Sequence, residues 1–188
     1  MEKKKQPAQL LLGPIPAALI GCGNGTENNI ITLAWVGVVN SNPPMISAAI
    51  RSNRHSFGII IESGEFTVNI PSAEQVEIVD LCGTLSGKDL NKFDRFNLKP
   101  ARGLFKKAPM IDECPISMEC ELEQTLNLGS HTAFIGKVIS SYVREDILDD
   151  KGKIDFSKCQ LLGFCAGSYL ATTPLGLNIG YTLKDNVK

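Results

Sequence analysis

Apolar and polar residues alternate along much of this chain with the period of two that is typical of β-strands. The clearest case is Ile116–Leu122, in which every second residue is apolar. We therefore predict a strand whose apolar residues face a core and whose polar residues, Ser117, Glu119 and Glu121, face solvent. Apolar, β-branched runs bounded by turn residues predict further strands at Ala17–Cys22, Asn29–Val39, Met45–Ile50, Glu65–Ile70, His131–Val143 and Gln160–Cys165.

Helical patterns are few and short. Ser56–Glu62 reads as a helix ended by Ser63-Gly64, Glu74–Cys82 as a second helix, and Leu85–Asn97 as a loop with a helical turn. Strands that follow one another in runs favour a mainly β fold, an antiparallel barrel with short helices, over a doubly wound parallel sheet. The glycines of Gly21–Gly25 are not followed by a helix, so they predict a hairpin turn and not a dinucleotide fingerprint.

Length and charge narrow the class of protein. The chain has 188 residues, which suits one domain over residues 1–188, with a core at about 14–170 and tails at 1–9 and 180–188. A net charge of −1 and 6% aromatic residues argue against a nucleic-acid partner or a membrane-surface binder. Leu10-Leu11-Leu12 is cut short by Gly13-Pro14, so we expect no signal peptide, no membrane association and a cytoplasmic location.

The six cysteines show no metal-binding or redox spacing. None is separated from another by two residues, and the chain has only two histidines, His55 and His131. We expect buried free thiols in a reducing compartment and no metal site.

A pair of arginines stands where a strand gives way to a helix. Arg51-Ser52-Asn53-Arg54-His55-Ser56 follows the strand that ends at Ile50 and precedes the helix expected from Ser56. Helix starts favour anions, and guanidinium groups suit phosphate oxygens, so this segment predicts a site for a phosphate-bearing ligand. The alternative is a solvated helix start with two surface arginines.

Several segments, taken in order, resemble the flavin-reductase-like family of FMN-binding split barrels, and its flavoredoxin branch in particular. They are Asn29–Trp35, Arg51–Ser56, Ser63–Pro71, Gly83–Lys88 with Lys92-Phe93, and Leu128–Val138. The resemblance covers roughly Pro14 to Leu170. It implies a Greek-key-type antiparallel split barrel, which agrees with the barrel predicted from the strand pattern.

The resemblance also implies a homodimer that holds FMN non-covalently at or near the subunit interface. The phosphate would lie near Arg51–Ser56, and the flavin ring along Asn29–Trp35 and the end of Met45–Ile50. The implied contacts are Asn29, Ile31, Thr32, Ala34, Trp35, Ile50, Arg51, Ser52, Arg54, His55 and Ser56. Trp35 would be an aromatic wall beside the ring, or else a core tryptophan.

Other implied contacts lie farther along the chain. The loop with Ser86, Gly87, Lys88 and Lys92 would approach the cofactor, although its lysines also read as solvated charges. Cys82 would line the pocket or be a buried helix residue, and Tyr169 would reach the same pocket. His131 is the predicted catalytic residue, placed to position a hydride donor or to relay a proton; a structural histidine is the alternative.

The activity implied by the resemblance is flavin-linked electron transfer. Our first expectation is an NAD(P)H-dependent flavin oxidoreductase, with NAD(P)H as electron donor. The alternatives are a flavoredoxin-type electron carrier reduced by a redox partner protein and a ligand-binding barrel without turnover. An oligonucleotide-binding barrel fits the charge and the aromatic content poorly.

Overall fold

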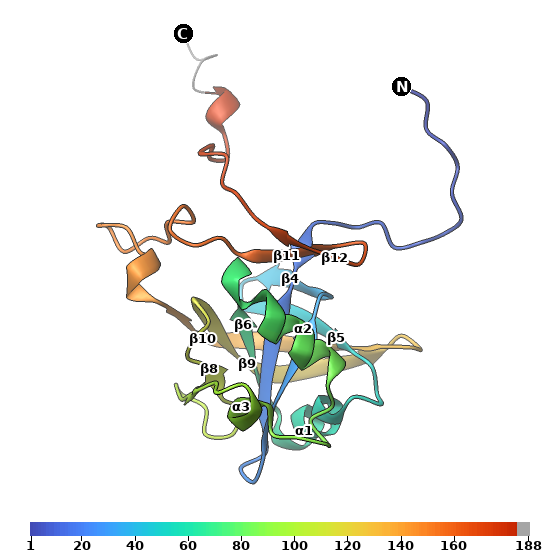
Figure 1. Cartoon of the computed structure of the whole chain (residues 1–188), viewed down its shortest axis with the longest axis vertical. Coiled ribbons are helices and arrows are strands. Elements are labelled where there is room, and N and C mark those ends of the chain that lie inside the picture. Colours follow the sequence, from blue (N-terminus) through green and yellow to red (C-terminus); the bar gives the residue numbers. More distant parts are fainter. Residues whose placement is uncertain (184–188) are drawn as a thin grey trace.

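The computed structural model describes residues 1–183 (Figure 1). Its main strands are β2 (Ala18–Gly23), β3 (Asn28–Leu33), β4 (Val36–Ser41), β5 (Pro44–Ile50), β6 (Glu65–Ile70), β9 (Ile116–Asn127) and β10 (Thr132–Val143). Shorter strands are β1 (Ile15–Pro16), β7 (Pro100–Ala101), β8 (Met110–Ile111), β11 (Leu162–Cys165) and β12 (Ser168–Ala171). The helices are α1 (His55–Ser63), α2 (Val76–Thr84) and α3 (Lys92–Arg95), with 3-10 turns η1 (Ala73–Gln75), η2 (Glu145–Ile147) and η3 (Tyr181–Leu183).

Seven strands form one antiparallel sheet in the order β3-β2-β6-β9-β10-β5-β4. Its two edge strands, β3 and β4, follow each other in the chain, so the sheet curls until its edges approach. The Ala49 N–H donates to the Trp35 carbonyl at 2.9 Å, which extends the β4–β5 pairing into the bend between β3 and β4. The mainly β split barrel predicted from the sequence is therefore confirmed.

The predicted single strand Asn29–Val39 is wrong. The chain bends at Ala34–Trp35, which separates β3 from β4 at opposite edges of the sheet. A continuous apolar run does not reveal this bend, because both strands and the bend are built from residues of similar hydropathy.

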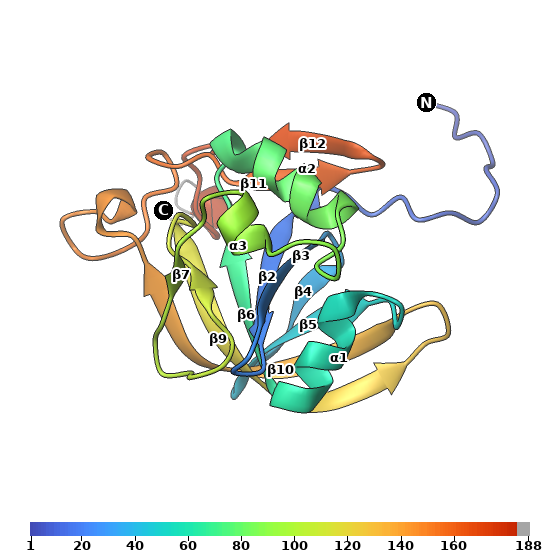
Figure 2. The ribbon, with the colours of Figure 1, turned by 60° about the horizontal axis from the view of Figure 1, so that its bottom comes forward.

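The barrel interior is filled by side chains from both halves of the sheet and closed at one end by α1. Phe66, Phe134 and Ile50 are fully buried there, and Ile59 and Ile60 of α1 pack against them. Figures 1 and 2 place α1 at one end of the molecule and the β11–β12 hairpin at the other.

A second core lies outside the barrel. All six residues of β2 are buried, because α2 and α3 cover its outer face while the barrel covers its inner face. Val79 and Cys82 of α2 and Phe93 of α3 pack on Leu19 and Ile30. Strand β11 pairs with β1 and β12, and Figure 2 shows the β11–β12 hairpin beside α2. Leu162 and Phe164 of β11 and Tyr169 of β12 pack into this second core.

The prediction that Ser117 and Glu119 face solvent is wrong. Ser117 is 5% exposed and Glu119 is fully buried, because the loop that leads from β7 to β8 covers this face of β9. The Glu119 carboxylate accepts hydrogen bonds from the backbone N–H groups of Leu104 and Phe105 at 3.0 and 2.8 Å, and from Tyr142 Oη at 3.1 Å and Ser140 Oγ. An alternating pattern shows which residues share a face, but not whether a second layer covers that face.

The remaining differences concern the ends of the chain and the thiols. Strand β12 was not predicted, and β9 extends to Asn127. All six cysteines are free, and five are buried, as the sequence predicted for most of them. Within residues 1–183, no helix is both long and apolar enough to cross a bilayer. Residues 184–188 of the predicted tail 180–188 lie outside the described residues.

Candidate functional site

Two adjoining hollows lie where β3 bends toward β4 and where α1 begins. The strand-side hollow is lined by Ile31, Thr32, Leu33, Ala34, Trp35, Ala49, Arg51, Arg54 and His131. The helix-side hollow is lined by Asn29, Ile31, Asn53, Arg54, His55, Ser56, Cys82, Gly83, Leu85, Ser86, Gly87 and Lys92. Ile31 and Arg54 border both, so the two hollows meet at these residues.

His131 stands at the strand-side hollow with three defined neighbours. The pairing of Thr132 with Ile50 brings His131 beside Arg51, whose Nε donates to His131 Nε2 at 3.4 Å. Ser130 Oγ lies 2.9 Å from His131 Nδ1, and the Trp35 ring lies 4.4 Å from the imidazole, centroid to centroid. Partial burial and the Arg51 charge lower the pKa of His131, so the ring is neutral at neutral pH.

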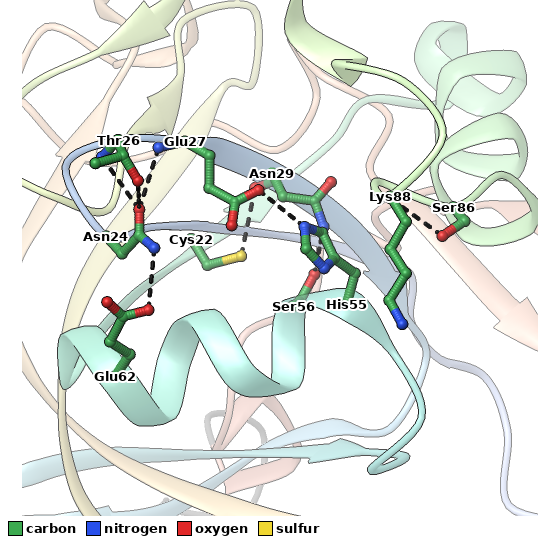
Figure 3. Close-up of polar contacts among 10 residues, drawn as sticks. All are labelled: Cys22, Asn24, Thr26, Glu27, Asn29, His55, Ser56, Glu62, Ser86 and Lys88. Atoms are coloured by element: carbon green, nitrogen blue, oxygen red, sulfur yellow. Dashed lines mark hydrogen bonds and ion pairs between the residues drawn. The ribbon is translucent and has the colours of Figure 1, made fainter.

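The helix-side hollow is built on the start of α1 (Figure 3). Ser56 is buried in the first turn, and Asn29 Nδ2 donates to its Oγ at 2.9 Å. In the part of the chain that the structure describes, the Arg54 side chain does not cap the helix, so N–H groups of the first turn of α1 lack this partner. The other atom of the amide, Asn29 Oδ1, is buried without a hydrogen-bond partner among the described residues.

Glu27 contacts His55, a residue of the helix-side hollow. Its Oε2 is 2.9 Å from His55 Nε2, as Figure 3 shows. The same figure shows Asn24 bridging from the β2–β3 turn to α1 through Glu62 at 3.0 Å. These contacts hold the β2–β3 turn against α1 and leave His55 paired to a carboxylate.

Lys92 is a buried charge behind the helix-side hollow. It is 2% exposed, and its Nζ donates to the carbonyls of Ile30 at 2.7 Å and Cys82 at 2.6 Å. Burial lowers the pKa of Lys92. Burial also raises the pKa of the Cys82 thiol to about 11, and the Lys92 charge opposes this rise. Cys82 is therefore a neutral thiol in the hollow wall.

Gly87 packs directly on the Asn29 amide. A Cβ atom at this position would lie 2.2 Å from Asn29 Oδ1, so any larger residue displaces the loop. Ser86 Oγ accepts from the Lys88 backbone N–H at 3.2 Å and turns the loop toward the hollow. Lys88 itself borders a neighbouring hollow together with Glu27 and Asn91.

The structure thus brings together most of the residues singled out from the sequence, but not all of them. Ile50 is fully buried in the barrel, and Ser52 is exposed; neither lines a hollow of the site. Tyr169 lies on β12, where its hydroxyl donates to Asp80 at 3.1 Å and its ring packs on Phe164. The individually predicted contacts did not include Leu33, Ala49, Asn53, Gly83 and Leu85, although Leu33 and Asn53 lie within the segments expected to hold the cofactor.

Comparison with known proteins assigns this architecture to a family. Residues 13–172 match the family described as "Flavin reductase like domain". The chain belongs to the flavin-reductase-like family. The resemblance stated from the sequence is thereby confirmed, and two solved structures place this family member with the flavoredoxins.

The first of these structures is the flavoredoxin of Desulfovibrio vulgaris (Miyazaki F), with 31% identity, a TM-score of 0.89, and coverage of 95% of this chain and 98% of that one. The second is a flavoredoxin from Methanosarcina acetivorans, with 31% identity, a TM-score of 0.88, and coverage of 99% and 100%. An uncharacterized protein of Pyrococcus abyssi is 33% identical over 139 residues, which are 74% of this chain and 80% of that protein.

Proposed function

We propose that this flavin-reductase-like protein binds FMN non-covalently in the two hollows and uses it to transfer electrons. The observation that carries the proposal is the junction at Arg54, where an aromatic-walled slot meets a pocket at a helix start. The flavin ring would occupy the strand-side hollow and the phosphate the helix-side hollow. Asn29, whose Oδ1 has no hydrogen-bond partner among the described residues, lines the helix-side hollow and suits a polar ligand with hydroxyl groups.

The strand-side hollow suits the edge of a flavin ring. Among the described residues β3 is an edge strand that pairs with β2 alone, so its outward backbone groups have no strand partner, although Lys92 occupies the Ile30 carbonyl. Flavin carbonyl and N–H groups need such partners, and backbone groups supply them without adding charge. Trp35, which is 44% exposed, offers an aromatic surface beside them.

The helix-side hollow suits a phosphate. The uncapped N–H groups of α1 favour an anion, and the Arg54 guanidinium supplies charge-assisted donors. The hydroxyls of Ser56 and Ser86 line the same hollow. Lys92 adds a positive charge behind it, held in place by two carbonyl groups.

When bound, FMN supplies the two-electron chemistry, and the chain supplies binding, orientation and electrostatics. Arg51 and Arg54 set a positive field at the strand-side hollow, which favours a ligand that gains negative charge. His131 would position the hydride donor over the hollow beside Trp35.

The donor we favour is NAD(P)H, because the strand-side hollow is open to solvent, so a ligand seated in it would keep a face that a donor can reach. The second candidate is an electron carrier reduced by a partner protein, and the similarity to two flavoredoxins favours it.

We further propose a homodimer in the cytoplasm. Exposed Leu10 and Leu12 border an apolar hollow that includes Trp35, a surface suited to a second copy, and six free thiols suit a reducing compartment.

An absorbance spectrum of the purified protein tests this proposal. We expect a flavin band, present at purification or retained after FMN is added and the excess removed. Bleaching by NADH or NADPH without oxygen supports the reductase, whereas bleaching by dithionite alone supports the carrier. If no flavin band is retained, the proposed function is wrong.

A further inference from the structure

The hydrogen-bond partners of His131 determine where its proton lies. Arg51 is always protonated and donates through Nε to His131 Nε2. A nitrogen that accepts a hydrogen bond carries no proton, so the proton of the neutral ring is on Nδ1. Ser130 Oγ, 2.9 Å from Nδ1, is then the acceptor of that proton.

We propose that Arg51 and Ser130 hold His131 as the neutral Nδ1–H tautomer, so that Nε2 serves the site as a hydrogen-bond acceptor. Ser130 acts through His131 and is thus a positioning residue. The inference about ligand recognition rests on the proposed flavin function, whereas the tautomer itself rests only on the contacts of the chain.

This assignment changes what His131 contributes. An imidazolium beside Arg51 and Arg54 would place a third positive charge at one hollow, whereas the neutral ring adds none. In the free protein the single Nε2 lone pair accepts from Arg51, so a ligand edge with an amide-type N–H group must replace the Arg51 Nε–H as the donor, which releases Arg51 to meet an anion. The imide N–H of a flavin ring and the carboxamide of a nicotinamide share this chemistry.

His55 provides an internal comparison, because its partner has the opposite character. Its Nε2 lies 2.9 Å from the Glu27 carboxylate, which only accepts hydrogen bonds, so the proton must be on Nε2. The two histidines of the chain therefore differ in the protonation of Nε2.

Long-range proton–nitrogen NMR of the 15N-labelled protein tests the assignment directly. With two histidines, a His55→Gln variant suffices to assign the signals. We expect His131 to show a protonated Nδ1 and an unprotonated Nε2, and His55 to show a protonated Nε2. A protonated Nε2 on His131 would overturn the proposal.

Ser130→Ala and Ser130→Thr form a matched pair. In Ser130→Ala, the Nδ1–H group loses its acceptor, so the two His131 nitrogen shifts should move toward each other as the tautomers mix. Ser130→Thr keeps the hydroxyl and should restore the separation. Identical spectra for the original protein and both variants would show that Ser130 does not position the ring.

Adding the ligands one after the other distinguishes the two possible donors of the N–H group, the flavin ring and the nicotinamide carboxamide. If the flavin edge supplies it, the His131 Nε2 signal moves when FMN is added. If the carboxamide supplies it, the signal moves only when reduced nicotinamide dinucleotide joins the flavin-bound protein. A ligand that binds by absorbance without moving the signal refutes the acceptor role. Failure to bind FMN instead refutes the proposed function and leaves the tautomer intact.

Discussion

Arg54 lines more of the candidate site than Arg51 does. Arg54 lines both hollows, whereas Arg51 lines only the strand-side hollow and is engaged with His131. The sequence could not separate the two arginines, because it shows only that both precede a helix. Their different positions follow from the β5–β10 register, which sets Arg51 opposite His131.

Arg54→Ala should therefore weaken FMN binding strongly. Loss of a charge-assisted contact costs about 1.5–3 kcal/mol, which is roughly a 10- to 150-fold rise in Kd. Arg51→Ala should also weaken binding, but less. Fluorescence titration with FMN measures both. Arg95→Ala, an exposed arginine on α3 outside both hollows, is the control and should bind as the original does. Equal FMN affinity in Arg54→Ala and the control would show that Arg54 does not bind the phosphate.

Glu119 is the residue that sequence interpretation placed least well. Burial raises the pKa of its carboxyl group, but hydrogen bonds from Ser140, Phe105, Leu104 and Tyr142 outweigh this, and the net pKa lies below the usual 4.5. A carboxylate that keeps its charge inside the protein fastens the loop before β8 to the sheet.

This lowered pKa predicts a pH-dependent stability. Because the folded-state pKa is below the unfolded one, Glu119 stabilises the fold above about pH 4.5, and the contribution is lost as pH falls through the folded-state value. Glu119→Gln should reduce the free energy of unfolding by about 1–3 kcal/mol at pH 7, since its amide nitrogen faces donors. The difference should shrink in acid. Urea unfolding at several pH values measures it, and a pH-independent difference would contradict this account.

At the level of elements, the strands were easier to predict than their connections. Alternation and turn residues identified β2, β5, β6 and β10 closely, because each is a continuous run that ends at a polar or turn residue. The bend at Ala34–Trp35 was missed, and it is the feature that creates the strand-side hollow. The local pattern of apolar and polar residues indicates which side chains are buried. The position of this bend depends instead on pairing with strands that are distant in sequence.

Helix α1 shows how one glycine ends an element. Gly64 has φ of 70° and donates to the Ile60 carbonyl, which is the left-handed C-terminal cap that the Ser63-Gly64 pair predicted. A Cβ at Gly64 would meet no atom within 4 Å, so the cost of a substitution is conformational and not steric.

Gly64→Ala should lower the free energy of unfolding by about 1 kcal/mol, the usual cost of a left-handed non-glycine residue. Gly58→Ala is the matched control, because Gly58 lies within α1 and also has open space around it. Helix propensity favours alanine there by up to about 1 kcal/mol, so this variant should be more stable than the original. Thermal unfolding of both measures the contrast; shifts of the same sign would contradict it.

At the level of the whole molecule, several large apolar side chains remain exposed. Leu12 is 81% exposed, Val38 80% and Leu128 64%, although the barrel interior is well filled. Such a surface is costly in water unless another surface covers it. The proposed homodimer would cover it, and a second copy would then narrow the entrance to the strand-side hollow.

We expect sedimentation velocity to give twice the mass of the chain at micromolar concentration. Leu12→Lys should shift the protein toward the monomer, because the substitution places a charge in the apolar hollow proposed as the contact. Lys88→Met, an exposed change on the loop beside the helix-side hollow, should leave the mass unchanged. A monomer in the original protein would contradict the proposal.

The open edge between β3 and β4 has a consequence for motion. Strands β3 and β4 lie at the two ends of the sheet, are joined by the short bend at Ala34–Trp35, and are not paired with each other in the described residues. The two edges can therefore move apart without breaking the hydrogen bonds between paired strands. The strand-side hollow of the candidate site lies at this bend. A ligand bound there would contact β3 and the bend and limit the separation of the two edges. Amide hydrogen exchange should then slow first in β3 and β4, and the melting temperature should rise as the ligand concentration increases.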